Sequence, residues 1–90
     1  MSVWTEIDGI ITIPKSSHHS LEKSFASCCG SLDFTYNEKH VHEEPAFRTV
    51  DVHIALCEDS IRACYVIQDW IHSMPKNSRV DITSEVRWIK

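Results

Sequence analysis

The 90-residue sequence contains only two glycines, Gly9 and Gly30. A loop that cradles a nucleotide phosphate needs several glycines close together, because only glycine lets the backbone approach the phosphate closely. Neither glycine lies in such a motif. The scarcity of glycine therefore excludes a P-loop or a dinucleotide-binding fingerprint and argues against most small-ligand loops.

Basic residues are also few. Lys and Arg total 9 against 13 Asp and Glu, which gives a net charge of −4 and an isoelectric point near 5.8. Binding to a nucleic-acid backbone depends on Lys and Arg clustered on one face. Nucleic acid is therefore disfavoured as a partner, and a protein with a basic surface is the better electrostatic match.

Long apolar runs are absent. None approaches the roughly 20 residues that a membrane-spanning helix requires, and the first residues, MSVWTEIDG, are acidic where an export signal would be basic and then apolar. We therefore expect a cytoplasmic protein without a membrane segment. Hydrophobic residues make up 42% and charged residues 24%, a globular composition, and the length predicts a single domain over residues 1–90.

The four cysteines have irregular spacing and no export signal beside them, so we expect them to be reduced and mostly buried. A cysteine nucleophile needs a thiolate near the positive end of a helix and a histidine base within reach. Cys28 and Cys29 fall instead at the negative end of a predicted helix. We predict that the protein is not an enzyme and that it holds no metal ion or other cofactor.

Alternating apolar and polar residues predict four strands, and apolar residues at helical spacing predict two helices. The strands are expected within residues 3–13, 31–37, 48–57 and 79–89. The first helix is expected over 18–29, capped by Ser16 or Ser17 and stopped by Gly30. The second is capped by Asp59 or Ser60 and ends before Pro75.

The order β-α-β-β-α-β predicts an α+β fold of the ferredoxin-like type, a four-stranded antiparallel sheet with both helices on one face. Right-handed crossovers place the first and third strands in the centre and the fourth and second at the edges. Gly9 falls on the helix-covered face, where its missing side chain leaves space for a large ring. Trp70 is the candidate for that ring.

The opposite face of the sheet carries no helix in this arrangement and is therefore where function is sought. Its outward positions are Glu6, Asp8, Asp33, Asp51, Asp81 and Glu85, with Arg79, Arg87 and His53, and the apolar Trp4, Ile10, Phe47 and Ile89. This acidic face with scattered apolar residues predicts a docking surface for a basic partner or a second copy of the chain. The alternative is a solvated surface on which Arg79 and Arg87 pair with neighbouring carboxylates.

The segment NEKHVHEEPAF, residues 37–47, is predicted to form an exposed hairpin tip. His40 and His42 are two residues apart, a spacing that lets two imidazoles of a strand converge on one metal ion. Parity places both on the helix side, however, unless a bulge intervenes. We therefore favour a solvated tip over a metal site.

The leading hypothesis is a non-catalytic protein-interaction module that binds a macromolecular target, as small viral or mobile-element accessory inhibitors do. The predicted binding residues are Trp4, Glu6, Asp8, His40, His42, Glu43, Glu44, Phe47, Asp51 and His53. The alternative is a small-ligand or metal-binding domain that uses His40, His42 and His53, built at a subunit interface. A homo-oligomer, such as a homodimer, joined through an edge strand or through the Val66 and Trp70 face of the second helix is a third hypothesis.

Overall fold

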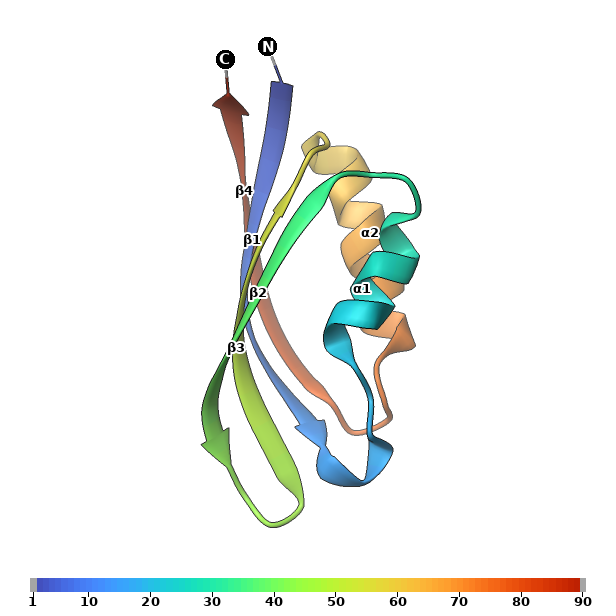
Figure 1. Ribbon diagram of the computed structural model, residues 1–90, viewed down its shortest axis with the longest axis vertical. Helices are drawn as coiled ribbons and strands as arrows, with labels where there is room; N and C mark the ends of the chain where they lie inside the picture. Colours follow the sequence, from blue (N-terminus) through green and yellow to red (C-terminus); the bar gives the residue numbers. More distant parts are fainter. Residues whose placement is uncertain (1, 90) are drawn as a thin grey trace.

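The computed structural model describes residues 2–89, and side chains over residues 3–85. The elements in chain order are β1 (Ser2–Pro14), a 3₁₀ turn η1 (Lys15–Ser17), α1 (Leu21–Cys29), β2 (Phe34–Glu43), β3 (Phe47–Leu56), α2 (Ser60–Ser73) and β4 (Arg79–Ile89). All strand pairs are antiparallel, in the order β2-β3-β1-β4. Both helices lie on one side of the sheet (Figure 1). The predicted ferredoxin-like fold, with strands one and three central, is confirmed.

The core lies between the helices and the two central strands. Every second residue of β1 and β3 points towards the helices and is buried, as the alternating pattern predicted. The buried apolar residues are Ile7, Ile11, Ile13, Leu21, Phe25, Cys29, Val50, Val52, Ile54, Leu56, Ala63, Val66 and Trp70. No helix in the described part of the chain is long and apolar enough to cross a membrane.

Helix α1 begins later than predicted. Ser20 is the N-cap, and its hydroxyl accepts a hydrogen bond from the backbone N–H of Lys23 at 3.3 Å. Ser16 and Ser17 lie in the 3₁₀ turn, so the prediction that one of them caps the helix was wrong. Gly30 ends α1 with a φ of +60°, and its N–H donates to the carbonyl of Ala26, which confirms the predicted stop.

Helix α2 begins and ends where predicted, but its buried face is narrower. The Asp59 carboxylate accepts from the N–H of Arg62 at 2.9 Å, and Pro75 follows the helix. Cys64 and Ile71 are exposed, although the apolar pattern placed both in the buried arc. The two edge strands lie at the margins of the helix layer, so one flank of α2 is left uncovered. The cysteines are also less buried than predicted: Cys29 is buried, Cys28 and Cys57 are half-buried, and Cys64 is exposed.

Trp70 packs against α1 rather than over Gly9. Its ring meets the Phe25 ring edge-on at a centroid distance of 4.9 Å, and its indole N–H donates to the Leu21 carbonyl and the Ser24 hydroxyl. At Gly9, the atoms closest to a hypothetical β-carbon belong to β4, with Cγ1 of Ile82 at 2.7 Å. The glycine thus allows a close approach of the neighbouring strand, and the predicted role of Trp70 there was wrong.

Candidate functional site

Within residues 2–89, no helix or loop covers the sheet face opposite the helices (Figure 1). The strand register places exposed residues of all four strands in rows across this face. One row runs Lys39, Asp51, Ile10, Asp81, and the next runs Asn37, His53, Asp8, Thr83. Ile10 therefore lies between two carboxylates that belong to the neighbouring strands.

Ile10 is the apolar centre of these two rows. It is 51% exposed, although it lies on a central strand of the sheet. Asp51 and Asp81 flank it directly, and both are exposed. We call Ile10 with Asp8, Asp51 and Asp81 the acidic centre. An apolar side chain among exposed carboxylates suits a basic partner that also buries an apolar group.

Asp8 and His53 form a hydrogen-bonded pair within the second row. The Nδ1 atom of His53 lies against Oδ1 of Asp8 on the adjacent strand. The hydrogen bond to Asp8 raises the pKa of His53, and the carboxylates of Glu6 and Asp51 contribute in the same direction. The pair therefore favours a protonated His53, which partly offsets the negative charge of this face as pH falls.

A histidine titration tests this pair. We expect the pKa of His53, followed by NMR, to lie above its ordinary value of about 6.5, and to fall back towards that value in Asp8→Asn. Because the folded pKa is raised, the stabilisation by the pair is fully present below the unfolded pKa. It is lost as pH rises through the folded pKa. Equal titration of His53 in both proteins would contradict the pairing.

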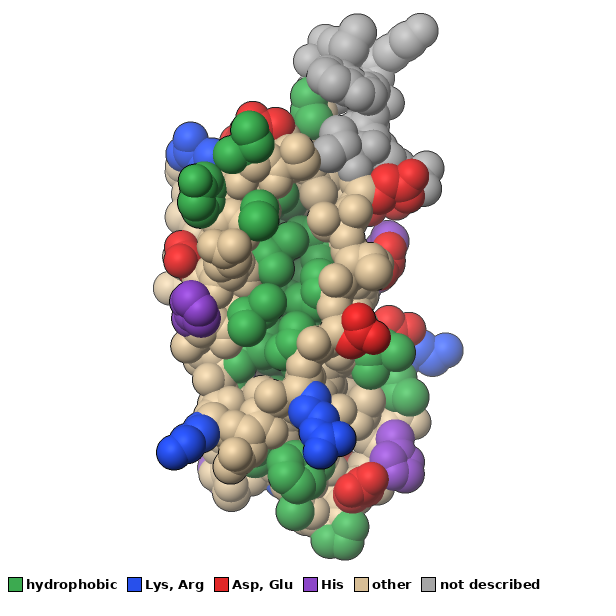
Figure 2. Space-filling view, turned by 180° about the vertical axis from the view of Figure 1, so that it is seen from behind, with side chains coloured by type: hydrophobic (Ala, Val, Ile, Leu, Met, Phe, Trp, Pro, Cys, Tyr) green, Lys and Arg blue, Asp and Glu red, His purple; other side chains and the backbone are tan. Residues whose placement is uncertain are grey.

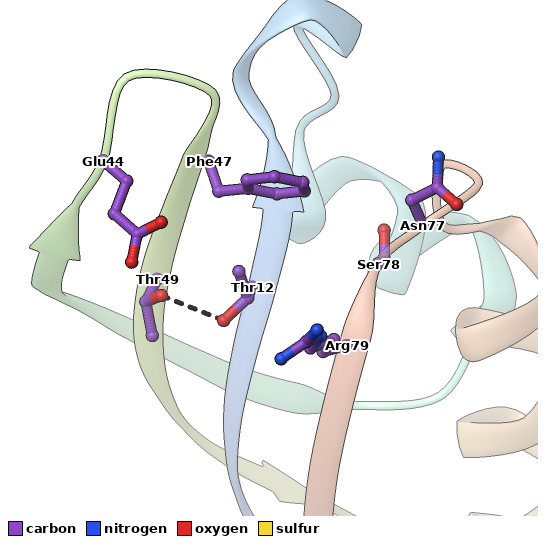
Figure 3. A pocket seen from close by; sticks show the side chains of 7 residues that line it. All are labelled: Thr12, Glu44, Phe47, Thr49, Asn77, Ser78 and Arg79. Carbon is purple, nitrogen blue, oxygen red and sulfur yellow. Dashed lines mark hydrogen bonds between the residues drawn. The ribbon is translucent and has the colours of Figure 1, made fainter.

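A hollow of about 580 Å³ lies on the same face, at the hairpin end (Figure 3). Its lining residues are Thr12, Glu44, Phe47, Thr49, Asn77, Ser78 and Arg79. Figure 3 shows the Phe47 ring extending across β1, above the hydrogen-bonded hydroxyls of Thr12 and Thr49, which lie 2.9 Å apart. One hydroxyl donates to the other, so one O–H of the pair remains available as a donor. The hollow thus combines an aromatic face with polar groups.

Arg79 lines this hollow, level with Thr12 in the strand register. Its guanidinium has no ion pair or hydrogen bond among the residues that the structure describes. The alternative in which Arg79 pairs with a neighbouring carboxylate of the same chain is therefore wrong. Arg87 and Ile89 lie outside the side chains that the structure describes.

His40 and His42 do not converge. Strand β2 continues to Glu43, well beyond the predicted end, and only Glu44–Ala46 form the connecting loop. A bulge at Val41 breaks the register, so that His40 pairs with Val50 and His42 with Thr49. Val50 faces the helices and Thr49 the open face, so the two histidines point to opposite sides of the sheet.

This placement removes the geometric basis of the predicted alternative metal site. His42 and His53 share the open face, but His40 does not join them. Among the described residues, no three His, Cys, Asp or Glu side chains are grouped so as to hold one metal ion. Strand parity alone could not show whether a bulge intervenes between the two histidines, and the bulge at Val41 is what separates them.

The two glutamates of the predicted tip are also separated. Glu43 pairs with Lys15 at 3.0 Å, and this hydrogen bond lowers the pKa of Glu43. Glu44 instead lines the hollow and lies 3.5 Å from Nε2 of His42. Of the two, Glu44 alone lies beside the open face.

Trp4 and Phe47, the predicted aromatic anchors, lie at opposite ends of the sheet. Phe47 is level with Pro14, ten residues from Trp4 along β1. At about 3.3 Å per residue they are separated by roughly 33 Å. Both side chains are half-buried. The predicted binding residues therefore do not form one compact patch, and the role of Trp4 stays a prediction.

Burial raises the pKa of Cys29 to about 11, with the neighbouring Cys28 thiol contributing. Burial also raises the pKa of Cys28, and the carboxylate of Asp69 acts in the same direction. Both thiols are therefore protonated at neutral pH, which makes them poor nucleophiles.

The chain matches no protein-family model and no curated protein. Among solved structures, it is similar to the de novo designed protein Foldit4, with a TM-score of 0.62 at 13% identity over 91% of this chain and 96% of that chain. It is also similar to a protein from Thermus thermophilus described as PII-like signaling, with a TM-score of 0.56 at 11% identity over 99% of this chain and 92% of that chain. At such identities the likeness shows the ferredoxin-like fold alone.

Proposed function

We propose that the protein is a non-catalytic interaction module that binds a basic protein surface through the open face of its sheet. The observation that carries this proposal is the acidic centre, where the exposed Ile10 is flanked by Asp51 and Asp81 on the two adjacent strands. The carboxylates attract a basic surface at long range, and the isoleucine supplies apolar area to bury on contact.

The hollow beside the acidic centre extends the proposed contact surface. Phe47 offers an aromatic face, and the Thr12 and Thr49 pair offers a hydroxyl donor. One side chain of the partner would insert into the hollow at the end of the sheet. Basic residues of the partner would then contact the carboxylates of the acidic centre. Glu44 at the rim suits a basic side chain.

We further propose that binding blocks the function of the target, as in small viral or mobile-element accessory inhibitors. This step rests on analogy: the chain is small and acidic, and its two helix-end cysteines have raised pKa values unsuited to nucleophilic catalysis. Adding the purified chain to the captured target and measuring the target's activity tests it directly. An unchanged activity at saturating binding would contradict inhibition and leave the interaction itself standing.

Capture from a lysate of the native host tests the interaction. The immobilised chain is expected to retain a basic protein that elutes at raised salt, and the double variant Asp51→Asn/Asp81→Asn is expected to lose it. The control is Glu22→Gln/Asp69→Asn, which removes the same charge from exposed helix positions. Equal capture by all three proteins, or equal loss in both variants, would contradict docking at the acidic centre.

A further inference from the structure

A strip of hydrophobic side chains runs along the molecule between α2 and β4 (Figure 2). Helix α2 contributes the half-buried Ile67 and Met74 together with Ile71, which is 37% exposed, and β4 contributes the half-buried Val80 and Ile82. We call these five residues the α2–β4 strip. It lies on the side away from α1 and away from the acidic centre.

The helix geometry explains why α1 leaves this strip open. At 100° per residue, Ile67, Ile71 and Met74 lie on the flank of α2 opposite Asp69. The carboxylate of Asp69 acts on the Cys28 thiol of α1, so its flank is the one that faces α1. The opposite flank therefore overhangs β4, the last strand on that side of the sheet.

Strand β4 lacks three features that protect many edge strands, namely a bulge, a proline and a lysine, although its open-face residues Arg79, Asp81 and Glu85 are charged. It pairs only with β1, in a continuous register without a bulge from Arg79 to Ile89. It contains no proline, and its helix-facing positions Val80, Ile82 and Ser84 are uncharged. The other edge, β2, has a bulge at Val41 and an exposed lysine at position 39. Bulges and lysines are common means of preventing edge pairing, so β2 is better protected than β4 against pairing with another strand.

We propose that β4 pairs with β4 of a second copy of this chain, antiparallel about a two-fold axis through Ile82 and perpendicular to the sheet. The two sheets then become one continuous sheet, and the helices of both copies lie on the same side of it. The two α2–β4 strips meet over the new strand pair and cover each other. The α2–β4 strip visible in Figure 2 becomes part of a shared core.

The charges of β4 favour this register. With Ile82 opposite itself, Arg79 of each copy lies opposite Glu85 of the other, and Asp81 lies opposite Thr83. Two pairs of opposite charge therefore form on the open face. The strand sequence fits a two-fold pairing with itself, which is the property that a symmetric interface requires.

Neighbouring registers are less favourable. An axis at Asp81 places that carboxylate opposite its own copy, and an axis at Thr83 places Asp81 opposite Glu85 in both halves. Like charges directly opposite each other are destabilising. A shift by one residue would direct the apolar side chains to the wrong face. Among axes at residues 81 to 83, the one through Ile82 alone avoids repulsion.

Charge exchange across the two-fold axis tests the proposal. By light scattering or sedimentation, the wild-type chain is expected at twice its 10.4 kDa mass. Arg79→Glu should weaken the dimer about tenfold or more, because two attractive pairs become repulsive. Arg79→Glu/Glu85→Arg restores both pairs with the charges exchanged and should recover the dimer. Lys39→Glu, the same charge change on the β2 edge, should leave the dimer unchanged.

Each remaining outcome contradicts the proposal. A wild-type chain that stays monomeric to millimolar concentration excludes the dimer, and equal weakening by Arg79→Glu and Lys39→Glu excludes this edge. Failure of the double variant to recover excludes this register. Circular dichroism confirms that each variant is folded, and amide exchange provides an independent measure, since β4 amides should exchange more slowly as chain concentration rises. The capture experiment varies Asp51 and Asp81 on the open face, whereas the charge exchange varies Arg79 and Glu85 across the β4 edge, so each proposal can fail alone.

Discussion

Replacement of Trp70 with alanine is expected to lower the free energy of unfolding by about 3–5 kcal/mol. The indole is fully buried, and its ring packs edge-on against Phe25 at 4.9 Å and near the Tyr36 ring at 6.4 Å. Truncation would leave a cavity where α2 meets α1 and β2. A domain of this size is stable by about 5–10 kcal/mol, so the variant would lose a large part of its stability.

Two further variants identify the cause of that loss. Trp70→Phe keeps most of the ring and removes the indole N–H, which donates to the Leu21 carbonyl and the Ser24 hydroxyl. The Ser24 hydroxyl also donates to that carbonyl, so the acceptor stays satisfied. The loss should then be nearer about 1–2 kcal/mol, from the shared hydrogen bond of one N–H donor to two acceptors and from a smaller void.

Tyr65→Ala removes an aromatic side chain of the same helix that is 64% exposed, and it should change stability by less than about 0.5 kcal/mol. Urea unfolding at a fixed chain concentration measures all three variants. If Trp70→Ala behaved like Tyr65→Ala, the packing between the helices would be wrong.

The fold was predictable because apolar and polar residues alternate along the central strands. This alternation makes one face of the sheet apolar, and the helices cover that face. The even spacing of Ile7, Ile11 and Ile13 and of Val50, Val52 and Ile54 fixes which face meets the helices, and those residues are buried as expected. The caps Asp59 and Gly30 were also predictable, because their chemistry is local. Local periodicity and local capping are properties of neighbouring residues in the chain.

Features that depend on distant residues were not predictable in this way. The bulge at Val41 reverses the face on which His42 lies. Residues 39–44, KHVHEE, contain no glycine or proline that would mark this irregularity in the sequence. The contact at Gly9 is made by Ile82, 73 positions later in the chain, so periodicity could not choose between it and Trp70. The width of the buried apolar stripe on α2 was overestimated. That width depends on how far the sheet extends beneath the helix, which is a property of the tertiary structure.

Which residues share the open face of the sheet was predictable, but which of them contact one another was not. Strand parity placed Asp8, Asp51 and His53 on one side, and the register brings them into adjoining rows. The hollow was missed, because it arises where the hairpin end of β3 lies near the Asn77–Ser78 turn. One indication was present, since Thr12 and Thr49 share the outward parity of Ile10 and Asp51.

Replacement of Ile10 with alanine is expected to weaken binding of the captured basic protein by about 30-fold or more. Hot-spot side chains at the centre of an interface cost about 2 kcal/mol or more when truncated, which corresponds to this factor. Ile10 has the position of such a residue, because carboxylates of both adjacent strands surround it. At 51% exposure it adds little to the core, so the melting temperature should change by only a few degrees.

Val41→Ala is the matched control, because Val41 is an aliphatic residue of the same sheet with 55% exposure, on the β2 bulge and outside the row that joins Asp51, Ile10 and Asp81. Calorimetric titration of the partner into wild type, Ile10→Ala and Val41→Ala separates the two positions. Retained affinity in Ile10→Ala would exclude an apolar anchor at the acidic centre. Equal losses in both variants would show a diffuse contact. A loss confined to Ile10, with thermal stability preserved, places the partner over the rows that join Asp51, Ile10 and Asp81.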